Sequence, residues 1–198
     1  VNKQGEGENQ GEDWNWNGDW LSPMGIDLQI NGGFGTAFPD LTVQGLPKLF
    51  DLLDQLWVDG VDAICPTFVS CGLEELRQAL FALREARQNT CFDRCQLLGA
   101  HLEGPFLAPG RHGAHALEYL SKPSISGLQD RINGFEDEID LVTLAPELSG
   151  SEVVIRHLKA LGIVVSLGHS FADDQTTKWA FKNGVSMVTH VFNAMNGL

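Results

Sequence analysis

The chain has 198 residues, of which 43% are hydrophobic and 20% charged, a composition typical of a globular protein with a sizeable core. Its 13 Lys and Arg against 26 Asp and Glu give a formal net charge of −13, which argues against a nucleic-acid or anionic-membrane surface. No apolar run is long enough to span a membrane and no basic-then-apolar signal peptide opens the sequence, so we expect a cytoplasmic protein.

Residues 1–20 are rich in Gly, Asn, Asp and Glu and carry five acids against one lysine. This composition predicts a flexible acidic arm, or the remnant of another element, rather than a part of the core.

From residue 21 onward, strand and helix patterns alternate. Runs of apolar residues predict strands at residues 26–30, 62–69, 96–102, 139–144, 163–167 and 186–191. Leucines at helical spacing, among them Leu76, Leu80 and Leu83, help to predict helices at residues 43–58, 73–87, 126–134, 151–161 and 172–183. A long loop rich in Gly and Pro follows the third strand. This rhythm predicts parallel βα units with right-handed crossovers.

Four cysteines, Cys65, Cys71, Cys91 and Cys95, lie within this region. The spacing of Cys91 and Cys95 is a weak metal signal without a matching second pair. We therefore expect reduced thiols and assign them no function.

Three predicted strands stop at a carboxylate or an imidazole, namely Glu103, His169 and His190. Each by itself is consistent with an ordinary polar strand end, but one carboxylate and two imidazoles together form a common ligand set for a catalytic divalent ion. Only curvature brings the ends of the third, fifth and sixth strands together. We therefore predict an α/β fold, a (β/α)8 TIM-type barrel of which about six βα units are present, with an open doubly wound sheet as the alternative.

Gln29 and Asn31 close the first strand and share one face, because side chains two apart in a strand point the same way. Amides are poor transition-metal ligands beside imidazole, so this pair predicts a site for a single metal. A polar strand end before a glycine turn is the other interpretation. The glycines of residues 32–35 do not match a dinucleotide fingerprint, which excludes a Rossmann fold.

Two loops add candidate site residues. His115, in the long loop after Glu103, is placed to hydrogen-bond a substrate or polarise a carbonyl. The turn after the sixth strand presents backbone N–H groups and the Asn193 amide toward the same mouth as His190. Glu147 is either an acid of the site or a helix cap.

Six motifs occur in order: IDLQINGGFG, GAHLEGPF, HGAH, VTLAPE, VSLGHS and THVFNAM. Together they resemble the N-acetylglucosamine-6-phosphate deacetylases of the amidohydrolase superfamily, over residues 21–198. The resemblance implies a partial metal-dependent amidohydrolase barrel. It also implies hydrolysis of N-acetyl-D-glucosamine 6-phosphate to D-glucosamine 6-phosphate and acetate, by metal-activated water, in amino-sugar catabolism.

The resemblance also implies roles for individual residues. It implies one divalent ion per subunit, zinc or iron, held by Glu103, His169 and His190. It implies four contacts to the substrate: Ala114, His115, Asn193 and Ala194. Gln29 and Asn31 match the subgroup with one catalytic metal.

Two departures are confined to loops: Pro23-Met24-Gly25 replaces the usual Pro-Gly-Phe, and Arg111-His112 replaces a Lys before Gly-Ala-His. The catalytic aspartate, a further substrate histidine and a basic phosphate contact are expected beyond Leu198, and the family's small β domain is nearly missing. We therefore expect a chain truncated at both ends that by itself folds poorly and does not turn over substrate.

Two other functions remain open at this point. One is a barrel amidohydrolase acting on a cyclic amide, and the other is a non-catalytic relative that binds only metal or sugar phosphate. In each case the expected partner is a small molecule rather than nucleic acid or membrane, and a homodimer is compatible with the sequence.

Overall fold

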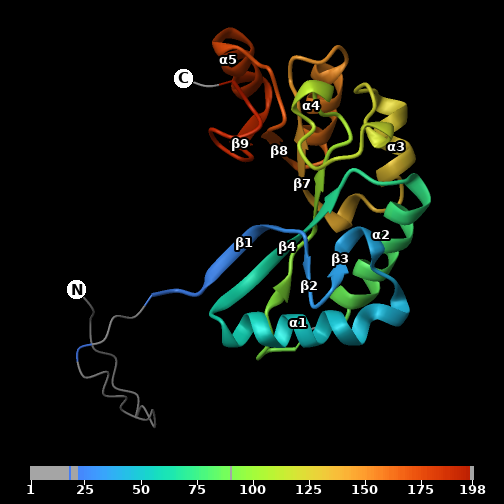
Figure 1. Ribbon diagram of the computed structural model, residues 1–198, viewed down its shortest axis with the longest axis vertical. Coiled ribbons are helices and arrows are strands. Elements are labelled where there is room, and N and C mark those ends of the chain that lie inside the picture. Colours follow the sequence, from blue (N-terminus) through green and yellow to red (C-terminus); the bar gives the residue numbers. More distant parts are fainter. Residues whose placement is uncertain (1–17, 19–21, 90, 197–198) are drawn as a thin grey trace.

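A curved parallel sheet forms the centre of the molecule (Figure 1). The computed structural model describes residues 18, 22–89 and 91–196. The main strands follow the order β1 (Gly25–Ile30), β4 (Val61–Val69), β6 (Ala100–Glu103), β7 (Ile139–Leu144), β8 (Val164–Leu167) and β9 (Val185–Val188), with the short β5 (Gln96–Leu97) also paired to β4. Every pairing in this sheet is parallel. The sheet is therefore an α/β half-barrel, open between β1 and β9 within the described residues.

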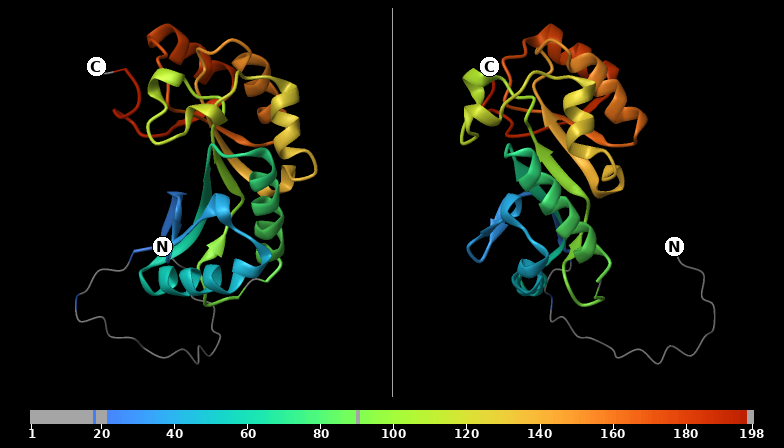
Figure 2. Two further views of the ribbon diagram at one scale, coloured as in Figure 1. Left: turned by 45° about the vertical axis from the view of Figure 1, so that its right-hand side comes forward. Right: turned by 90° about the vertical axis from the view of Figure 1, so that its right-hand side faces the viewer.

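Helices follow the strands and cover the outer side of the sheet (Figure 2). They are α1 (Leu46–Val58), α2 (Leu73–Arg87), α3 (Ile125–Ile132), α4 (Ser151–Ala160) and α5 (Asp174–Asn183). From α2 to α5, each helix packs against the next one along the chain. A small antiparallel hairpin, β2 (Gly32–Gly33) with β3 (Thr36–Ala37), precedes α1. None of the described helices is long and apolar enough to cross a membrane.

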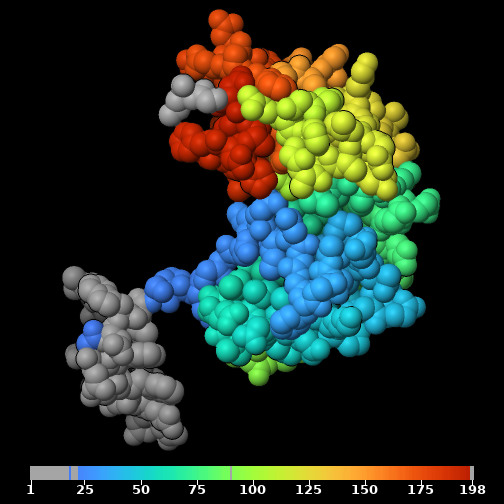
Figure 3. Space-filling model, in the orientation of Figure 1, coloured from blue at the N-terminus to red at the C-terminus, as the bar shows by residue number. Residues whose placement is uncertain are grey.

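Short 3-10 turns fill the connections: η1 (Phe38–Asp40), η2 (Val43–Gly45), η3 (Pro109–Arg111), η4 (Leu117–Tyr119) and η5 (Glu136–Glu138). Figure 3 shows that the surface is hollowed on the side where the N-terminal strands and the C-terminal segment face each other. This hollow lies at the open side of the half-barrel.

Helix α2 has the bounds that its leucine spacing predicts. Leu76, Leu80 and Leu83 point into the core, and acidic residues in the first turn and arginines in the last turn favour the helix dipole. Arg84 and Arg87 both pair with Glu138 of η5, at 3.0 and 2.6 Å. The amphipathic pattern and these ion pairs together fix α2 against the sheet.

The two faces of the sheet differ in polarity, because successive side chains of a strand point to opposite faces. The outer face is apolar and packs against the helices; it includes Ile64, Leu102, Val142, Leu144 and Val165. The inner face carries buried polar residues: Thr67, His101, Glu103, Thr143 and Ser166. The core therefore lies between sheet and helices, and the concave side is left for polar groups.

Several predicted elements differ in detail from the observed ones. The predicted strand 96–102 is divided into β5 and β6, because the pairing with β4 shifts by one residue around Gly99, whose N–H donates to Asp140 Oδ2 at 2.7 Å. The predicted helix 172–183 begins at Asp174, because the Asp173 carboxylate accepts the Thr176 N–H and caps it. The predicted strand 186–191 ends at Val188.

The prediction of about six βα units is met only in part. The six main strands of the parallel sheet are present, but β9 is not followed by a helix within residues 22–89 and 91–196. A closed barrel is likewise not seen in this part of the chain. The arm predicted at residues 1–20 lies, apart from Gly18, outside the described residues.

Leu80 tests the core between α2 and the sheet, since its side chain is completely buried. In the complete gene product, Leu80→Ala should lower the free energy of unfolding by about 2–5 kcal/mol, because it removes buried methyl groups and leaves a cavity. Leu161→Ala is the control, since Leu161 is 42% exposed at the end of α4; it should change stability by less than about 1 kcal/mol. Denaturant titration measures both, and equal effects would contradict this description of the core.

The cysteines provide a second test. Burial raises the pKa of the Cys65 thiol to about 12, and its Sγ donates to the Gly99 carbonyl at 2.9 Å, whereas Cys91 is exposed. Because the thiolate is the reactive form, a maleimide at pH 8 should modify Cys91 rapidly and Cys65 only after unfolding. Peptide mass spectrometry measures the two rates, and equal labelling in the native protein would contradict the burial of Cys65.

Candidate metal centre

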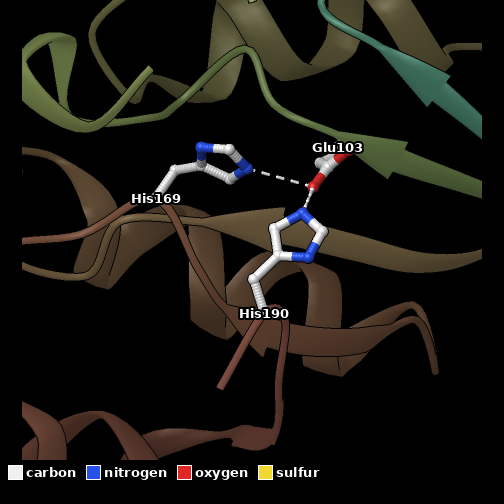
Figure 4. Close-up of side chains that lie close together, drawn as sticks. All are labelled: Glu103, His169 and His190. Carbon is white, nitrogen blue, oxygen red and sulfur yellow. Dashed lines mark hydrogen bonds and ion pairs between the residues drawn. The ribbon is translucent and has the colours of Figure 1, made fainter. Parts of the chain in front are cut away.

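One carboxylate and two imidazoles meet at the carboxyl ends of the strands (Figure 4). Glu103 is the last residue of β6, and His169 and His190 each lie two residues beyond the ends of β8 and β9. The Glu103 Oε1 atom lies 2.7 Å from His190 Nε2 and 3.1 Å from His169 Nε2. One ligand atom from each residue lies within 4.8 Å of the others. The structure thus brings together the three residues that the sequence predicts as a ligand set.

Unusual backbone conformations deliver the two imidazoles. His169 has φ 50° and His190 has φ 57°, in the left-handed region that non-glycine residues rarely adopt. Each such residue costs about 1–3 kcal/mol and persists only where the surrounding structure enforces its conformation, and such residues cluster at functional sites. Gly104, directly after Glu103, has φ 94°, and a Cβ there would collide with Ser70 Oγ. The strand end therefore requires glycine at this position.

The hydrogen bonds of His169 show which of its ring nitrogens carries the proton. Its Nδ1 lies 2.8 Å from the Arg111 carbonyl oxygen, which can only accept, so Nδ1 carries the proton and Nε2 faces Glu103. Burial by itself would lower the pKa of His169, but the hydrogen bonds to Glu103 and to the Arg111 carbonyl and the negative charge of Glu103 together outweigh it and raise the pKa. Burial alone would raise the pKa of Glu103, but the neighbouring His115 and His169 hold that pKa well below its usual range. The carboxylate therefore stays ionised.

The chemistry of this donor set fits a divalent metal ion. When His169 carries its proton on Nδ1, its Nε2 presents a lone pair to Glu103 Oε1, and two lone pairs at 3.1 Å repel each other unless a proton or a cation joins them. A metal ion removes this repulsion. The Arg111 carbonyl fixes the ring orientation of His169, as a hydrogen-bond acceptor on the other ring nitrogen commonly does for metal-binding histidines.

Gln29 reaches the same carboxylate from β1. Its Nε2 donates to Glu103 Oε2 at 3.1 Å and to Asn31 Oδ1 at 3.4 Å. The Gln29 Oε1 atom is buried and has no hydrogen-bond partner among the described residues. The Gln29 amide thus uses the second carboxylate oxygen of Glu103 as a hydrogen-bond acceptor. A site for a single metal is consistent with this contact and stays a prediction.

His115 lies at the edge of the cluster, and the roles of its two ring nitrogens are the reverse of those in His169. The Ser70 N–H donates to its Nδ1 at 3.1 Å, so a neutral ring carries its proton on Nε2, which lies 3.7 Å from Glu103 Oε2. Its ring packs edge-on against that of His169, with centroids 4.7 Å apart. His115 therefore offers the site a hydrogen-bond donor, whereas His169 offers a lone pair. Ala114, next to it, is exposed in the loop.

Comparison with known proteins identifies relatives of this chain, although no model of a protein family matches it. The N-acetylglucosamine-6-phosphate deacetylase of Bos taurus is 40% identical over 177 residues, which cover 88% of this chain and 43% of that protein. The N-acetylgalactosamine-6-phosphate deacetylase of Escherichia coli O157:H7 is 35% identical over 182 residues, covering 90% and 46%. The chain is a homologue of the N-acetylglucosamine-6-phosphate deacetylases. It spans less than half of the length of these relatives.

A solved structure agrees with this relationship. A mutant N-acetyl-D-glucosamine-6-phosphate deacetylase from Mycobacterium smegmatis, in complex with N-acetyl-D-glucosamine-6-phosphate, superimposes with a TM-score of 0.76 at 28% identity, covering 88% of this chain and 44% of that one. The resemblance that the motifs indicate is thereby confirmed.

In this deacetylase homologue the other two predicted substrate contacts lie in a tight turn after His190. The Asn193 N–H donates to the His190 carbonyl at 2.7 Å, and the Ala194 N–H donates to Asn193 Oδ1 at 3.0 Å. The Ala194 carbonyl accepts the Ser170 N–H at 3.1 Å, which ties the turn to the loop after His169. Asn193 and Ala194 thus lie beside the cluster, and their contact with substrate stays a prediction.

The structure assigns Glu147 a positioning contact rather than a place in the cluster. Its carboxylate accepts from Ser170 Oγ and from the Phe171 N–H, both at 2.6 Å, and so holds the loop that follows His169. Neither interpretation left open by the sequence describes these contacts, because Glu147 is not part of the metal-ligand group and the N-caps of α4 and α5 are Gly150 and Asp173.

Two residues near the cluster, the half-buried Ser70 and the buried His101, were missed by the sequence interpretation. Ser70 orients His115, and His101 lies beneath Glu103 on the same face of β6. Burial lowers the pKa of His101 to about 4, although the charge of Glu103 and the hydrogen bond to the Leu28 carbonyl oppose it. The period of two in strands was the available signal for His101, because it stands two residues before Glu103. Nothing in the local sequence marks Ser70.

Variants of the cluster distinguish ligands from substrate contacts. In the complete gene product, Glu103→Ala and His169→Ala should abolish binding of one equivalent of divalent metal, because each removes a donor atom of the set. His115→Asn should retain the metal, because its Nδ1 is already used by Ser70. Elemental analysis after dialysis measures the stoichiometry, and two equivalents in the unmodified protein would contradict the prediction of a single metal.

Proposed function

We propose that the complete gene product is a metal-dependent N-acetylglucosamine-6-phosphate deacetylase. It would hydrolyse N-acetyl-D-glucosamine 6-phosphate to D-glucosamine 6-phosphate and acetate. The observation that carries the proposal is the convergence of Glu103, His169 and His190 in a chain homologous to these deacetylases. Because the chain matches about 43% of its relatives' length, the activity is proposed for the whole protein.

The fold of the whole protein is proposed to be a (β/α)8 barrel, to which residues 21–198 contribute about six units. Two observations support it: the sheet is already curved, and β1 exposes Ile26 and Leu28 at its free edge, at 59% and 40%. Such an exposed parallel edge favours pairing with further strands. Residues 1–20 are proposed to belong to an acidic arm or to a small second domain.

Glu103, His169 and His190 are proposed to hold one metal ion, zinc or iron. Imidazole and carboxylate donors suit both metals, and three protein ligands leave positions open for water and substrate. When bound, the metal supplies Lewis-acid polarisation of the substrate's carbonyl and lowers the pKa of water. Gln29, by donating to Glu103 Oε2, keeps that oxygen from a second ion.

His115 is proposed to bind the acetamide carbonyl of the substrate. Its Nδ1 accepts from the Ser70 N–H, so its Nε2–H is free to donate into the site, and Ser70 keeps the ring from turning. A preorganised donor of this kind stabilises the charge that develops on the carbonyl oxygen. Ala114 is proposed to contact the substrate beside it.

Asn193 and Ala194 are proposed to contact the sugar phosphate from the turn after His190. The Asn193 side chain is exposed in this turn, and a neutral side-chain amide can donate to phosphate oxygens without net positive charge, which suits a chain of net charge −13. Glu103 is the only carboxylate in the cluster formed by the described residues. The aspartate that takes a proton from water and returns it to the amine is therefore proposed to lie outside them. A homodimer and a cytoplasmic location stay predictions.

An acetate-release assay tests the proposal. The metal-loaded gene product should release acetate from N-acetyl-D-glucosamine 6-phosphate. His115→Asn should lower kcat by about 10²- to 10³-fold, since it removes a donor to the carbonyl. N-acetyl-D-galactosamine 6-phosphate is the comparison substrate, because one relative is named for it. Hydrolysis of a dihydropyrimidine in place of both sugars, or no turnover at all, would contradict the proposal.

A further inference from the structure

A continuous series of hydrogen bonds crosses the concave side of the sheet beneath the metal centre. Ser166 Oγ lies 2.7 Å from Thr189 Oγ1, which lies 2.8 Å from Thr143 Oγ1. Thr143 Oγ1 lies 2.7 Å from His101 Nε2, and His101 Nδ1 lies 3.1 Å from the Leu28 carbonyl oxygen. The four side chains are buried, with at most 8% exposed. We call these five residues the hydroxyl–imidazole ladder.

The donors and acceptors of the ladder have one consistent direction. The Leu28 carbonyl can only accept, so His101 Nδ1 carries the proton and Nε2 of the neutral ring accepts from the Thr143 hydroxyl. Thr143 Oγ1 then accepts from Thr189, and Thr189 Oγ1 accepts from Ser166. Each hydroxyl donates once, and no polar atom of the ladder lacks a partner.

Two of these bonds join strands that are not neighbours. The His101–Leu28 bond passes from β6 to β1 over β4, and the Thr143–Thr189 bond passes from β7 to the end of β9 over β8. Backbone pairing fixes the spacing of adjacent strands but leaves the curvature of the sheet adjustable. A bond between next-but-one strands on the concave side fixes that curvature.

Four of the five ladder members, all but Thr143, stand one to three residues before residues of the metal centre. The pairs are Leu28 with Gln29, His101 with Glu103, Ser166 with His169, and Thr189 with His190. Glu103 and His190 come from strands separated by β7 and β8, so the distance between them depends on the curvature. We propose that the hydroxyl–imidazole ladder is a positioning device that sets this curvature and thereby holds the metal ligands at binding distance. This inference rests on the proposed metal centre.

A purely structural role is the alternative, since buried polar groups need partners in any case. The two differ in what a broken ladder changes. Loss of a structural bond lowers stability alone, whereas loss of a positioning bond weakens metal binding while the protein remains folded. Thr143 is the informative position, because it links the two bonds that span non-adjacent strands.

The experiment compares Thr143→Val, Thr143→Ser and Ser151→Ala in the complete gene product. Valine keeps the shape of Thr143 but removes both bonds, and serine keeps the hydroxyl. Ser151 is the control, because its buried hydroxyl donates to the Ala145 carbonyl at 2.8 Å, outside the ladder. Competition with a chromogenic chelator gives the apparent Kd for Zn2+, under conditions where denaturant titration shows each variant to be folded.

Thr143→Val should weaken Zn2+ binding by about 10- to 100-fold, as the loss of a residue that supports metal ligands by hydrogen bonding commonly does. Thr143→Ser should restore most of the affinity, and Ser151→Ala should lower the unfolding midpoint without changing the Kd. Nitrogen-15 NMR should show His101 as the Nδ1–H tautomer. If Thr143→Val does not fold, Ser166→Ala removes only the terminal bond, and its Kd should rise relative to Ser151→Ala.

Unchanged Zn2+ affinity in a folded Thr143→Val, or in Ser166→Ala where that variant replaces it, would overturn the inference while leaving the metal centre intact. An Nε2–H tautomer of His101 would overturn the assigned direction of the ladder and the inference with it. Failure of the unmodified protein to bind Zn2+, Fe2+ or another divalent ion would instead overturn the proposed metal centre, and the positioning role would fall with it.

Discussion

The ionised carboxylate of Glu103, 2% exposed at the end of β6, is the group on which the rest of the site depends. Removing such a charge from water costs several kcal/mol, so it must be surrounded by donors or cations. The Nε2 atoms of His169 and His190 lie within hydrogen-bond distance of Oε1. The Gln29 amide donates to Oε2, and His115 Nε2 lies 3.7 Å from the same oxygen. These partners come from four separate segments of the chain. A buried charge therefore dictates where β1, the long loop and the ends of β8 and β9 must lie.

The polarity of the sheet follows from the same requirement. Leu102 and Val142 point outward to the helices, while the alternate residues His101, Glu103 and Thr143 point inward. The stability of the fold therefore comes mainly from the layer between sheet and helices. The concave side contributes little apolar burial and is instead held by hydrogen bonds with assigned directions. Because the apolar core lies on the outer face, polar and ionised residues can occupy the inner face without weakening that core.

Two neighbouring histidines illustrate how the backbone selects chemical roles. His169 donates from Nδ1 to a carbonyl, and His115 accepts at Nδ1 from an N–H, so the same side chain presents a lone pair in one case and a proton in the other. One tautomer suits a metal ligand, and the other suits a donor to a substrate oxygen. The loop that contains Arg111 and the backbone of Ser70 thus decide which residue can do which task.

The sequence by itself determined the local elements and the type of chemistry. Helix α2 and strand β7 have the bounds that their apolar spacing predicts, and Glu103, His169 and His190 stand at strand ends as expected. These features are set within a few residues by side-chain periodicity. The tertiary structure alone decided that His169 and His190, which stand 66 and 87 positions after Glu103 in the sequence, both lie against its Oε1 atom. It also decided that Glu147 holds the loop after His169 and that His101 belongs to the hydroxyl–imidazole ladder. Such contacts depend on strand order, register and curvature, which arise from packing across the whole sheet. The local sequence marks at most which residues share a face of a strand, as for His101 and Glu103, and not which distant residue each of them meets.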